Sequence, residues 1–305
     1  MKNDKLKGGI FITLGAGCYG MLGTYVKMAY QAGFNTAEVT IAQFSLGVLG
    51  LFILTLLRRP QPAGNTSGSV KSKVRLLLAG TSIGLTSVFF YLSVKYIAVG
   101  VATVLLTQSV WIGVVVEAII QKKNPGIGKL LAVLIIISGT ILATNVLEQS
   151  ISFNWKGVLF GLLSALCYTV TMYSTNQLEI HFPPLKRSLF MILGGLIVIL
   201  FVFHKSVNPQ FSGSIFFSWG LVLALFGTIL PPLLFTRGMP LTGIGLGAIL
   251  ASIELPIAVI MAGILLHEQV LVSQWIGVTL ILAAVIWMNI PKQQTIKSKI
   301  YDNKN

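Results

Sequence analysis

Long apolar segments, separated by short polar connections, follow one another along almost the whole chain. A helix crosses the hydrocarbon core of a bilayer with about 20 mostly apolar residues. Ten windows of roughly this length fit the pattern: 8–29, 37–57, 74–94, 98–120, 130–147, 155–175, 188–204, 215–236, 241–266 and 271–290. The longest hydrophilic stretch, 58–73, is rich in Pro, Gly and Ser and is typical of a loop. The pattern predicts an all-α membrane protein with ten transmembrane helices and no separate soluble domain.

Composition agrees with this prediction and excludes several function classes. The 305 residues are 54% hydrophobic and only 10% charged, whereas soluble domains carry about 25% charged residues. The net charge of +14 does not indicate a nucleic-acid partner, because the basic residues lie between apolar segments and form no stripe. No phosphate-binding loop, nucleophile elbow or metal-ligand spacing occurs, so we expect neither an enzyme nor a cofactor or metal site.

The basic residues also indicate an orientation. Lys and Arg concentrate on the cytoplasmic side of membrane proteins. If the N-terminus lies inside, 18 of the 22 basic residues fall in cytoplasmic connections, and only Lys27, Lys95, Lys156 and Lys205 fall outside. We therefore predict a multi-pass protein of the cell inner membrane, surrounded by lipid, with both termini in the cytoplasm.

The two halves of the chain match each other weakly. At a shift of 149 residues the matches include Gly8 with Gly157, Phe11 with Phe160, and Cys18-Tyr19 with Cys167-Tyr168; at a shift of 143, Ser109 matches Ser252. Chance similarity between apolar helices is the alternative explanation. Five helices per half is an odd number, so the halves would enter the membrane from opposite faces. This predicts two inverted five-helix repeats, 1–150 and 151–305, the second with a short basic cytoplasmic tail, and favours transport by alternating access.

The ninth and tenth segments carry the clearest motifs. They contain Ser252-Ile253-Glu254-Leu255-Pro256, then Leu265-Leu266-His267-Glu268, and then Gln274-Trp275-Ile276-Gly277. In these stretches, and in its pattern from 8 to 290, the chain resembles the EamA family of drug/metabolite transporters. It departs from the family where Leu255 separates Glu from Pro and where His267 replaces a usual Gly. The resemblance implies ten helices, cytoplasmic termini, and secondary transport of metabolites, amino acids or drugs, usually outward and without ATP.

Glu254 is the main candidate for chemistry, because an ionised carboxylate is costly in the middle of a membrane segment. Pro256 lacks an N–H, which predicts that the carbonyl of Ser252 is left free beside Glu254. The structural alternative is a protonated Glu that holds a neighbouring helix. Glu117 lies near a segment end and is more simply an ion-pair partner of Arg75 or Arg58.

Four further side chains are expected at the same depth as Glu254. They are Tyr19, Gln108, Trp111 and Tyr168, from the first, fourth and sixth segments. Aromatic and amide groups there either line a substrate pocket or fill helix contacts; Gln43 is a weaker candidate. Glycines at every third position, Gly17, Gly20 and Gly23, form a small face for close helix packing. Pro231-Pro232 would free the carbonyls of Gly227 and Thr228.

Several functions remain open from the sequence alone. The first is a secondary transporter that exports a small-molecule substrate, with protons coupled through Glu254. The alternative is a passive facilitator or channel for small solutes. An intramembrane enzyme is disfavoured, because His181, His204 and His267 lie near segment ends, and a scaffold or sensor would move no solute. The protein is expected as a monomer or a homodimer.

Overall fold

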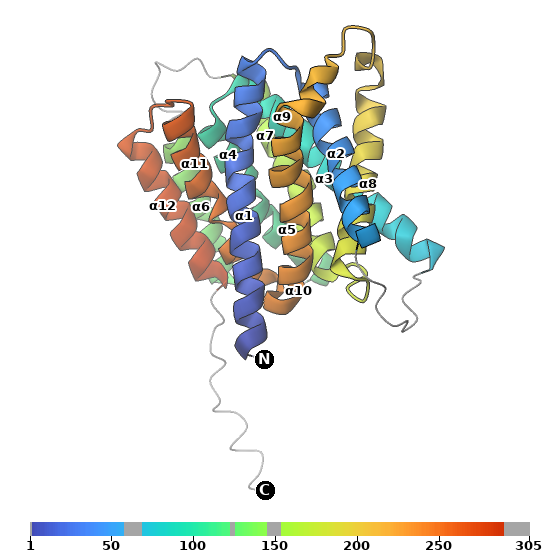
Figure 1. The fold of residues 1–305 in the computed structure, drawn as a ribbon. Helices are drawn as coiled ribbons and strands as arrows, with labels where there is room; N and C mark the ends of the chain where they lie inside the picture. Colours follow the sequence, from blue (N-terminus) through green and yellow to red (C-terminus); the bar gives the residue numbers. More distant parts are fainter. Residues whose placement is uncertain (1, 58–68, 123–125, 145–153, 290–305) are drawn as a thin grey trace, which may run out of the picture.

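The computed structural model describes residues 2–57, 69–122, 126–144 and 154–289, and this part of the chain is helical, with no strand. Figure 1 shows the helices gathered side by side in one bundle. The helices of the first half are α1 (Lys2–Gln31), α2 (Thr36–Leu57), α3 (Val70–Tyr96), α4 (Val99–Leu106), α5 (Ser109–Gln121) and α6 (Ile127–Thr144). Those of the second half are α7 (Trp155–Gln177), α8 (Pro184–Val202), η1 (His204–Ser206), η2 (Gly213–Phe217), α9 (Trp219–Leu223), η3 (Ala224–Ile229), α10 (Leu230–Ala251), α11 (Glu254–Leu265) and α12 (Val272–Asn289).

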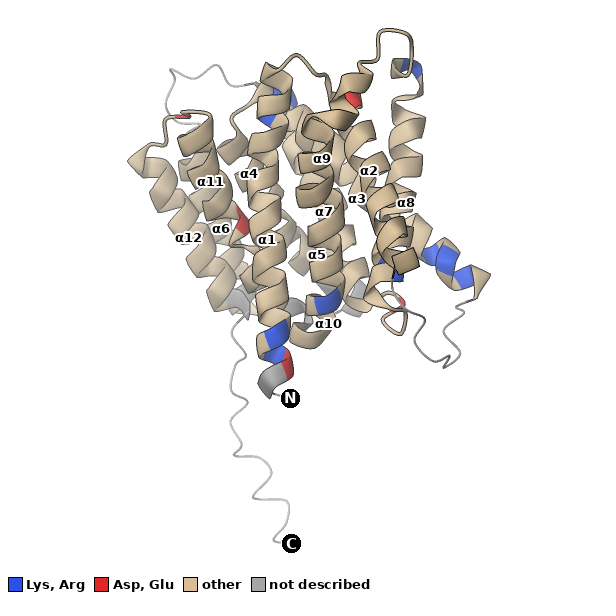
Figure 2. Ribbon diagram, in the orientation of Figure 1, with Lys and Arg blue, Asp and Glu red and all other residues tan. Residues whose placement is uncertain are grey.

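Several of these helices are long and apolar enough to cross a membrane. Within the described residues there are seven candidate spans, and three shorter apolar helices accompany them: Leu130–Thr144, Ile249–Leu265 and Val272–Trp287. Many large apolar side chains are exposed on the outside of the bundle, as expected of a surface that faces lipid. Lys and Arg lie mainly at the two ends of the bundle (Figure 2). The prediction of an all-helical, multi-pass membrane protein is therefore confirmed.

Helices of the first half pack on helices of the second half. α1 contacts α10 and α11, α3 contacts α7 and α8, and α6 contacts α12. Small residues permit these contacts, as predicted for the glycine face of α1: a Cβ on Gly20 would lie 2.7 Å from the carbonyl oxygen of Glu254. Such close backbone approach is typical of helix packing in membranes. The position of α1 thus fixes the start of α11.

Two of the predicted continuous segments are broken. The segment predicted at 98–120 is divided into α4 and α5 at Thr107 and Gln108, and the one at 241–266 is divided at Ser252 and Ile253. Pro256 explains the second break, since it cannot donate to the carbonyl four residues before it. The expectation of a free Ser252 carbonyl was wrong, because this oxygen accepts the N–H of Leu255 at 3.1 Å. A tighter turn replaces the missing helical bond.

The predicted boundary between the eighth and ninth segments, at 236–241, was also wrong. α10 remains helical through this stretch and contains Pro240. Before α10 the backbone forms the π-helix η3, directly ahead of Pro231-Pro232. Its wider turn is the local response to two successive residues without an N–H. The prolines of this region therefore alter helix geometry without ending the helix.

Polar contacts join the helices at both ends of the bundle. Glu38 forms a reciprocal capping pair with Asn35 at the start of α2, and its second oxygen accepts the N–H of Ser212 at 2.7 Å. At the opposite end Arg75 lies 3.4 Å from Glu179. Arg58 and the side chain of Glu117 lie outside what the structure describes.

Candidate functional site

Glu254 is the first residue of α11 and stands directly after the helix break. Its side chain is buried, with 7% exposure, and its Oε2 accepts a hydrogen bond from the Tyr168 hydroxyl at 3.2 Å. Tyr168 belongs to α7, so this bond joins two helices. A break in a membrane helix leaves backbone groups without helical partners and commonly lies beside a binding site. Glu254 therefore has the surroundings of a functional carboxylate.

Tyr19 approaches the same carboxylate from α1. Its ring stacks on Phe235 with 5.7 Å between centroids, and it lies close enough to Glu254 to sense the charge of the carboxylate. Tyr19 and Tyr168 are the two tyrosines of the repeated Cys-Tyr pair, and both keep part of their surface accessible. Neither cysteine forms a disulfide. The structure thus brings three of the predicted residues together.

Gln108 and Trp111 form a second, separate polar group. The Gln108 amide donates to Thr140 Oγ1 at 2.7 Å and to the Val104 carbonyl at 2.9 Å, and its oxygen accepts the Trp111 indole N–H at 2.9 Å. Trp111 packs in the apolar cluster that contains Leu255, the residue after Glu254. The two groups therefore lie near each other at the start of α11, and no hydrogen bond links them among the described side chains.

Ser252 is buried and turns inward on its own helix. Its hydroxyl donates to the Ile249 carbonyl at 2.6 Å. Serine hydroxyls commonly bond a carbonyl of the preceding turn in this way and bend the helix. Ser252 shapes the break beside Glu254, and no described bond connects it with the carboxylate.

A polar pair missed by the sequence analysis lies next to Tyr19. The hydroxyl of Tyr91 on α3 donates to Oε1 of Gln43 on α2, and each side chain is only 1% exposed. The backbone carbonyl of Gln43 accepts a hydrogen bond from the Thr228 hydroxyl at 3.0 Å, and Thr228 belongs to the π-helix η3. Gln43 is a weaker candidate of the sequence analysis, and a buried amide in an apolar helix needs a partner. Tyr91 gave no comparable signal, since tyrosine is common in cores.

Arg187, near the start of α8, is likewise buried, with 1% exposure. Its guanidinium donates to the carbonyl of Thr175 at 2.7 Å and to that of Thr236 at 3.1 Å. Pro240 lies four residues after Thr236 and has no N–H to offer, and Thr175 lies in the last turn of α7. Arg187 thus supplies donors to two carbonyls that their own helices leave unpaired.

Glu254 is the buried ionisable group of this arrangement, and the Tyr168 hydroxyl donates a hydrogen bond to it. No cluster of metal-ligating side chains occurs in the described ranges.

A helical membrane bundle with a carboxylate at a helix break has the architecture of a membrane transporter. The chain belongs to the EamA-like transporter family, whose sequence model matches residues 6–145 and 155–290. The predicted family is confirmed, and so is the prediction of a transporter rather than an enzyme.

Named relatives agree with this assignment. The chain is 27% identical over 213 residues to the "Uncharacterized inner membrane transporter YicL" of Salmonella typhimurium, an alignment that covers 68% of this chain and 70% of the relative. It is 25% identical over 302 residues to the "Uncharacterized transporter YcbK" of Bacillus subtilis, with 96% of each chain covered. A solved crystal structure shares the fold with a TM-score of 0.65 at 11% identity, covering 94% of this chain and 96% of the other.

Proposed function

We propose that this protein is a secondary transporter that exports small metabolites, amino acids or drugs by alternating access, with protons coupled through Glu254. The observation that carries the proposal is the buried carboxylate at the α10–α11 break, in contact with Tyr168 and near Tyr19. The three side chains come from helices of both halves, so a movement of one half against the other changes their surroundings. Gln108, Trp111 and Ser252 complete the proposed substrate and coupling region.

The packing of the helices supports two inverted halves of five helices, residues 1–150 and 151–305. The three shorter apolar helices would bring the seven candidate spans to ten. α1 packs on α10 as α7 packs on α3, and α1 packs on α11 as α7 packs on α4. An exchange of this kind between equivalent helices is what a pseudo-two-fold axis produces. The two stretches that match the family model, of nearly equal length, are in accord with it.

Reporter fusions test the orientation. A reporter that is active only outside the cytoplasm is expected to give no signal after Lys304 and a strong signal after Lys156, because the basic residues concentrate on the side of the N-terminus. The opposite pattern would refute cytoplasmic termini and reverse the direction of every step proposed for the cycle.

Counterflow in liposomes tests the function. Proteoliposomes are loaded with one unlabelled amino acid, nucleoside or cationic drug at a time, and the same solute is added outside in labelled form. Accumulation of the label inside is expected only for the true substrate. A pH gradient is expected to drive net flux. Counterflow without any response to the gradient would favour a passive facilitator, because coupling requires a proton that binds the two conformations differently. No flux of any tested solute would favour a scaffold or sensor.

A further inference from the structure

The turn between α3 and α4 is held by charged side chains from two other helices. α3 ends at Tyr96 and α4 begins at Val99, so only Ile97 and Ala98 join them. The last turn of a helix leaves carbonyls without helical partners and carries partial negative charge, and the first turn leaves N–H groups and carries partial positive charge. The α3–α4 turn therefore presents both kinds of unpaired backbone group within a few residues.

Lys27 of α1 binds the carbonyl side of this turn. Its ammonium donates to the carbonyl of Val94, in the last turn of α3, at 2.7 Å. The Tyr30 hydroxyl, also on α1, donates to the Tyr91 carbonyl at 3.0 Å. A positive charge is stabilising at a helix C-terminus. The end of α1 is thereby fastened to the end of α3.

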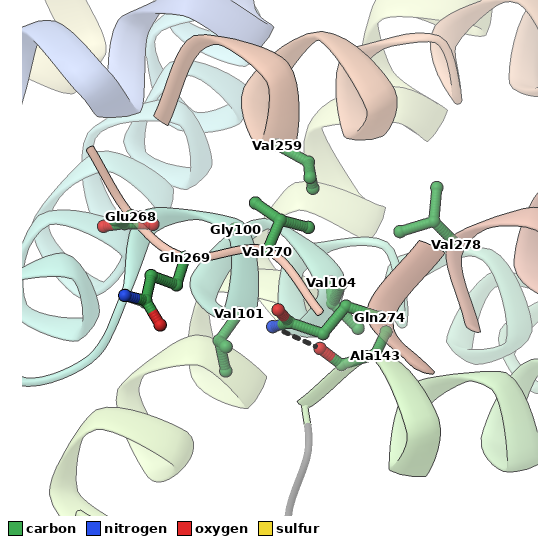
Figure 3. A pocket seen from close by; sticks show the side chains of 11 residues that line it. Gly100, Val101, Val104, Ala143, Val259, Glu268, Gln269, Val270, Gln274 and Val278 are labelled. Atoms are coloured by element: carbon green, nitrogen blue, oxygen red, sulfur yellow. Dashed lines mark hydrogen bonds between the residues drawn. The ribbon is translucent and has the colours of Figure 1, made fainter. Parts of the chain in front are cut away.

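Glu268, which follows α11, binds the N–H side of the turn. Its Oε1 accepts the N–H of Val99 at 3.1 Å, and Ala98 before it makes no side-chain cap, so Glu268 caps α4 from a distant part of the chain. His267 adopts the left-handed conformation with φ 53°, and the N–H of Glu268 bonds back to the Ala262 carbonyl at 3.3 Å. This geometry commonly ends a helix. Figure 3 shows Glu268 at the edge of a small space lined by valines of α4 and α11.

The two charges also interact with each other. The Glu268 carboxylate lies within electrostatic reach of the Lys27 ammonium, and both side chains are partly buried. Each charge has the sign that the helix end beside it favours, and the two opposite signs offset one another. Lys27, Glu268 and the turn at Ile97-Ala98 thus form one unit, the α3–α4 clasp.

The α3–α4 clasp joins the helices that surround Glu254. Tyr19 and Lys27 lie on α1, and α11, with 12 residues and a length of about 18 Å, separates Glu254 at its start from Glu268 beyond its end. On the other side, Tyr168 lies on α7, which packs on α3 and α4. A path that runs from Glu254 between these helices to the clasp separates α1 and α11 from α3 and α4. Such a path breaks the bonds of both charges.

We propose that the α3–α4 clasp is the gate that closes the Glu254 site toward the end of the bundle away from the N-terminus. The proposal rests on the proposed function, because a gate controls a route to a transport site, and in the proposed orientation this end is the outer one. In the closed state both charges bind backbone groups. In the open state water replaces these partners, so the net strength of each bond is modest. Bonds of this kind hold two groups of helices together and still permit their separation.

Distances between spin labels, measured by electron paramagnetic resonance on the purified full-length protein in nanodiscs, test the gate without requiring transport. Labels at Gln31 and Lys156 report the separation of α1 from α7 at the clasp end of the bundle. Labels at Lys5 and Gln177 report the separation of the same two helices at the other end. All four side chains are exposed.

The variant that carries both Lys27→Met and Glu268→Leu is expected to open the clasp end. The ratio of long to short distances between Gln31 and Lys156 is expected to rise about tenfold or more, since hydrogen bonds to charged groups have strengths of that order. The pair at the other end is expected not to lengthen. All proteins carry alanine at Cys18 and Cys167, so that only the introduced cysteines are labelled.

Lys95→Met is the matched control, because it also removes a positive charge from the last turn of α3, and the exposed Lys95 ammonium lies over the Tyr96 ring, 5.9 Å from its centroid. It is expected to keep the wild-type distances, and Lys27→Arg, which retains the donor, is expected to stay nearer the wild type than Lys27→Met. If the double variant loses monodisperse elution, Lys27→Met alone decides by the same criterion.

Three results would overturn the gate: unchanged distances at the clasp end, equal lengthening in Lys95→Met, or lengthening at both ends, which would mean general loosening of the bundle. Counterflow of a solute together with unchanged distances would refute the clasp and leave the proposed transporter standing. Lengthening at the clasp end alone, with no flux of any tested solute, would support the clasp and count against the transporter.

Discussion

The Glu254→Gln variant is expected to lose proton-driven flux while it retains substrate exchange. Glutamine keeps the size of the side chain and can still accept the Tyr168 hydroxyl, which lies 3.2 Å from Oε2 in the native protein. It cannot ionise, so it represents the protonated state permanently. In the proposed cycle the closed site favours the neutral carboxylate, and opening to water on one side lets the proton leave. A variant fixed in the neutral form therefore has no step that a pH gradient can drive.

Two transport assays on one preparation separate coupling from exchange. Net flux is measured in liposomes with an imposed pH gradient, and exchange is measured as counterflow with equal pH on both sides. Glu179→Gln is the matched control, because it removes a carboxylate at the end of the bundle, where Glu179 pairs with Arg75. Wild-type response of Glu254→Gln to the gradient would exclude Glu254 as the coupling group and leave it as a contact between α7 and α11.

Replacement of Arg187 by leucine is expected to lower the free energy of unfolding more than any other substitution proposed for this protein. The guanidinium donates to the carbonyls of Thr175 and Thr236, which α7 and α10 leave unpaired at a helix end and at Pro240. A buried group without its partner costs about 1–3 kcal/mol, so two such carbonyls give about 2–6 kcal/mol. Removal of the buried Arg187 charge also relieves its desolvation cost, and this part of the change raises the free energy of unfolding. The expected net effect is a loss, because two buried carbonyls are left without a donor while one charge is removed.

Thermal unfolding in detergent measures this effect, with Lys186→Leu as the control for loss of a neighbouring positive charge. Arg187→Leu is expected to unfold several degrees below the wild type and below Lys186→Leu. Arg187→Lys is expected to fall between them, because an ammonium is a point charge and lacks the planar fork that reaches two carbonyls on different helices. An unchanged midpoint in Arg187→Leu would mean that water or another donor satisfies both carbonyls.

The tertiary structure changes the interpretation of several residues that the sequence had placed correctly. Arg187 counted as one of the basic residues of a polar connection, and in the structure it is buried between three helices. Gln108 and Trp111 were expected at the same depth as Glu254, and they form their own group with Thr140. A sequence window gives the depth of a residue along its helix, and it gives no information about the direction in which the side chain meets other helices.

The sequence by itself determined that the chain is a helical membrane protein of the EamA-like family and that Glu254 is the carboxylate to examine. These conclusions depend on local properties: the length of each apolar segment, the cost of a charge within it, and motifs of a few neighbouring residues. Only the tertiary structure decided where the helices break, that Tyr168 donates to Glu254, and that Gln43 pairs with Tyr91. Each of these depends on contacts between helices far apart in the chain, and apolar residues that suit any lipid-facing or buried surface do not encode such contacts locally.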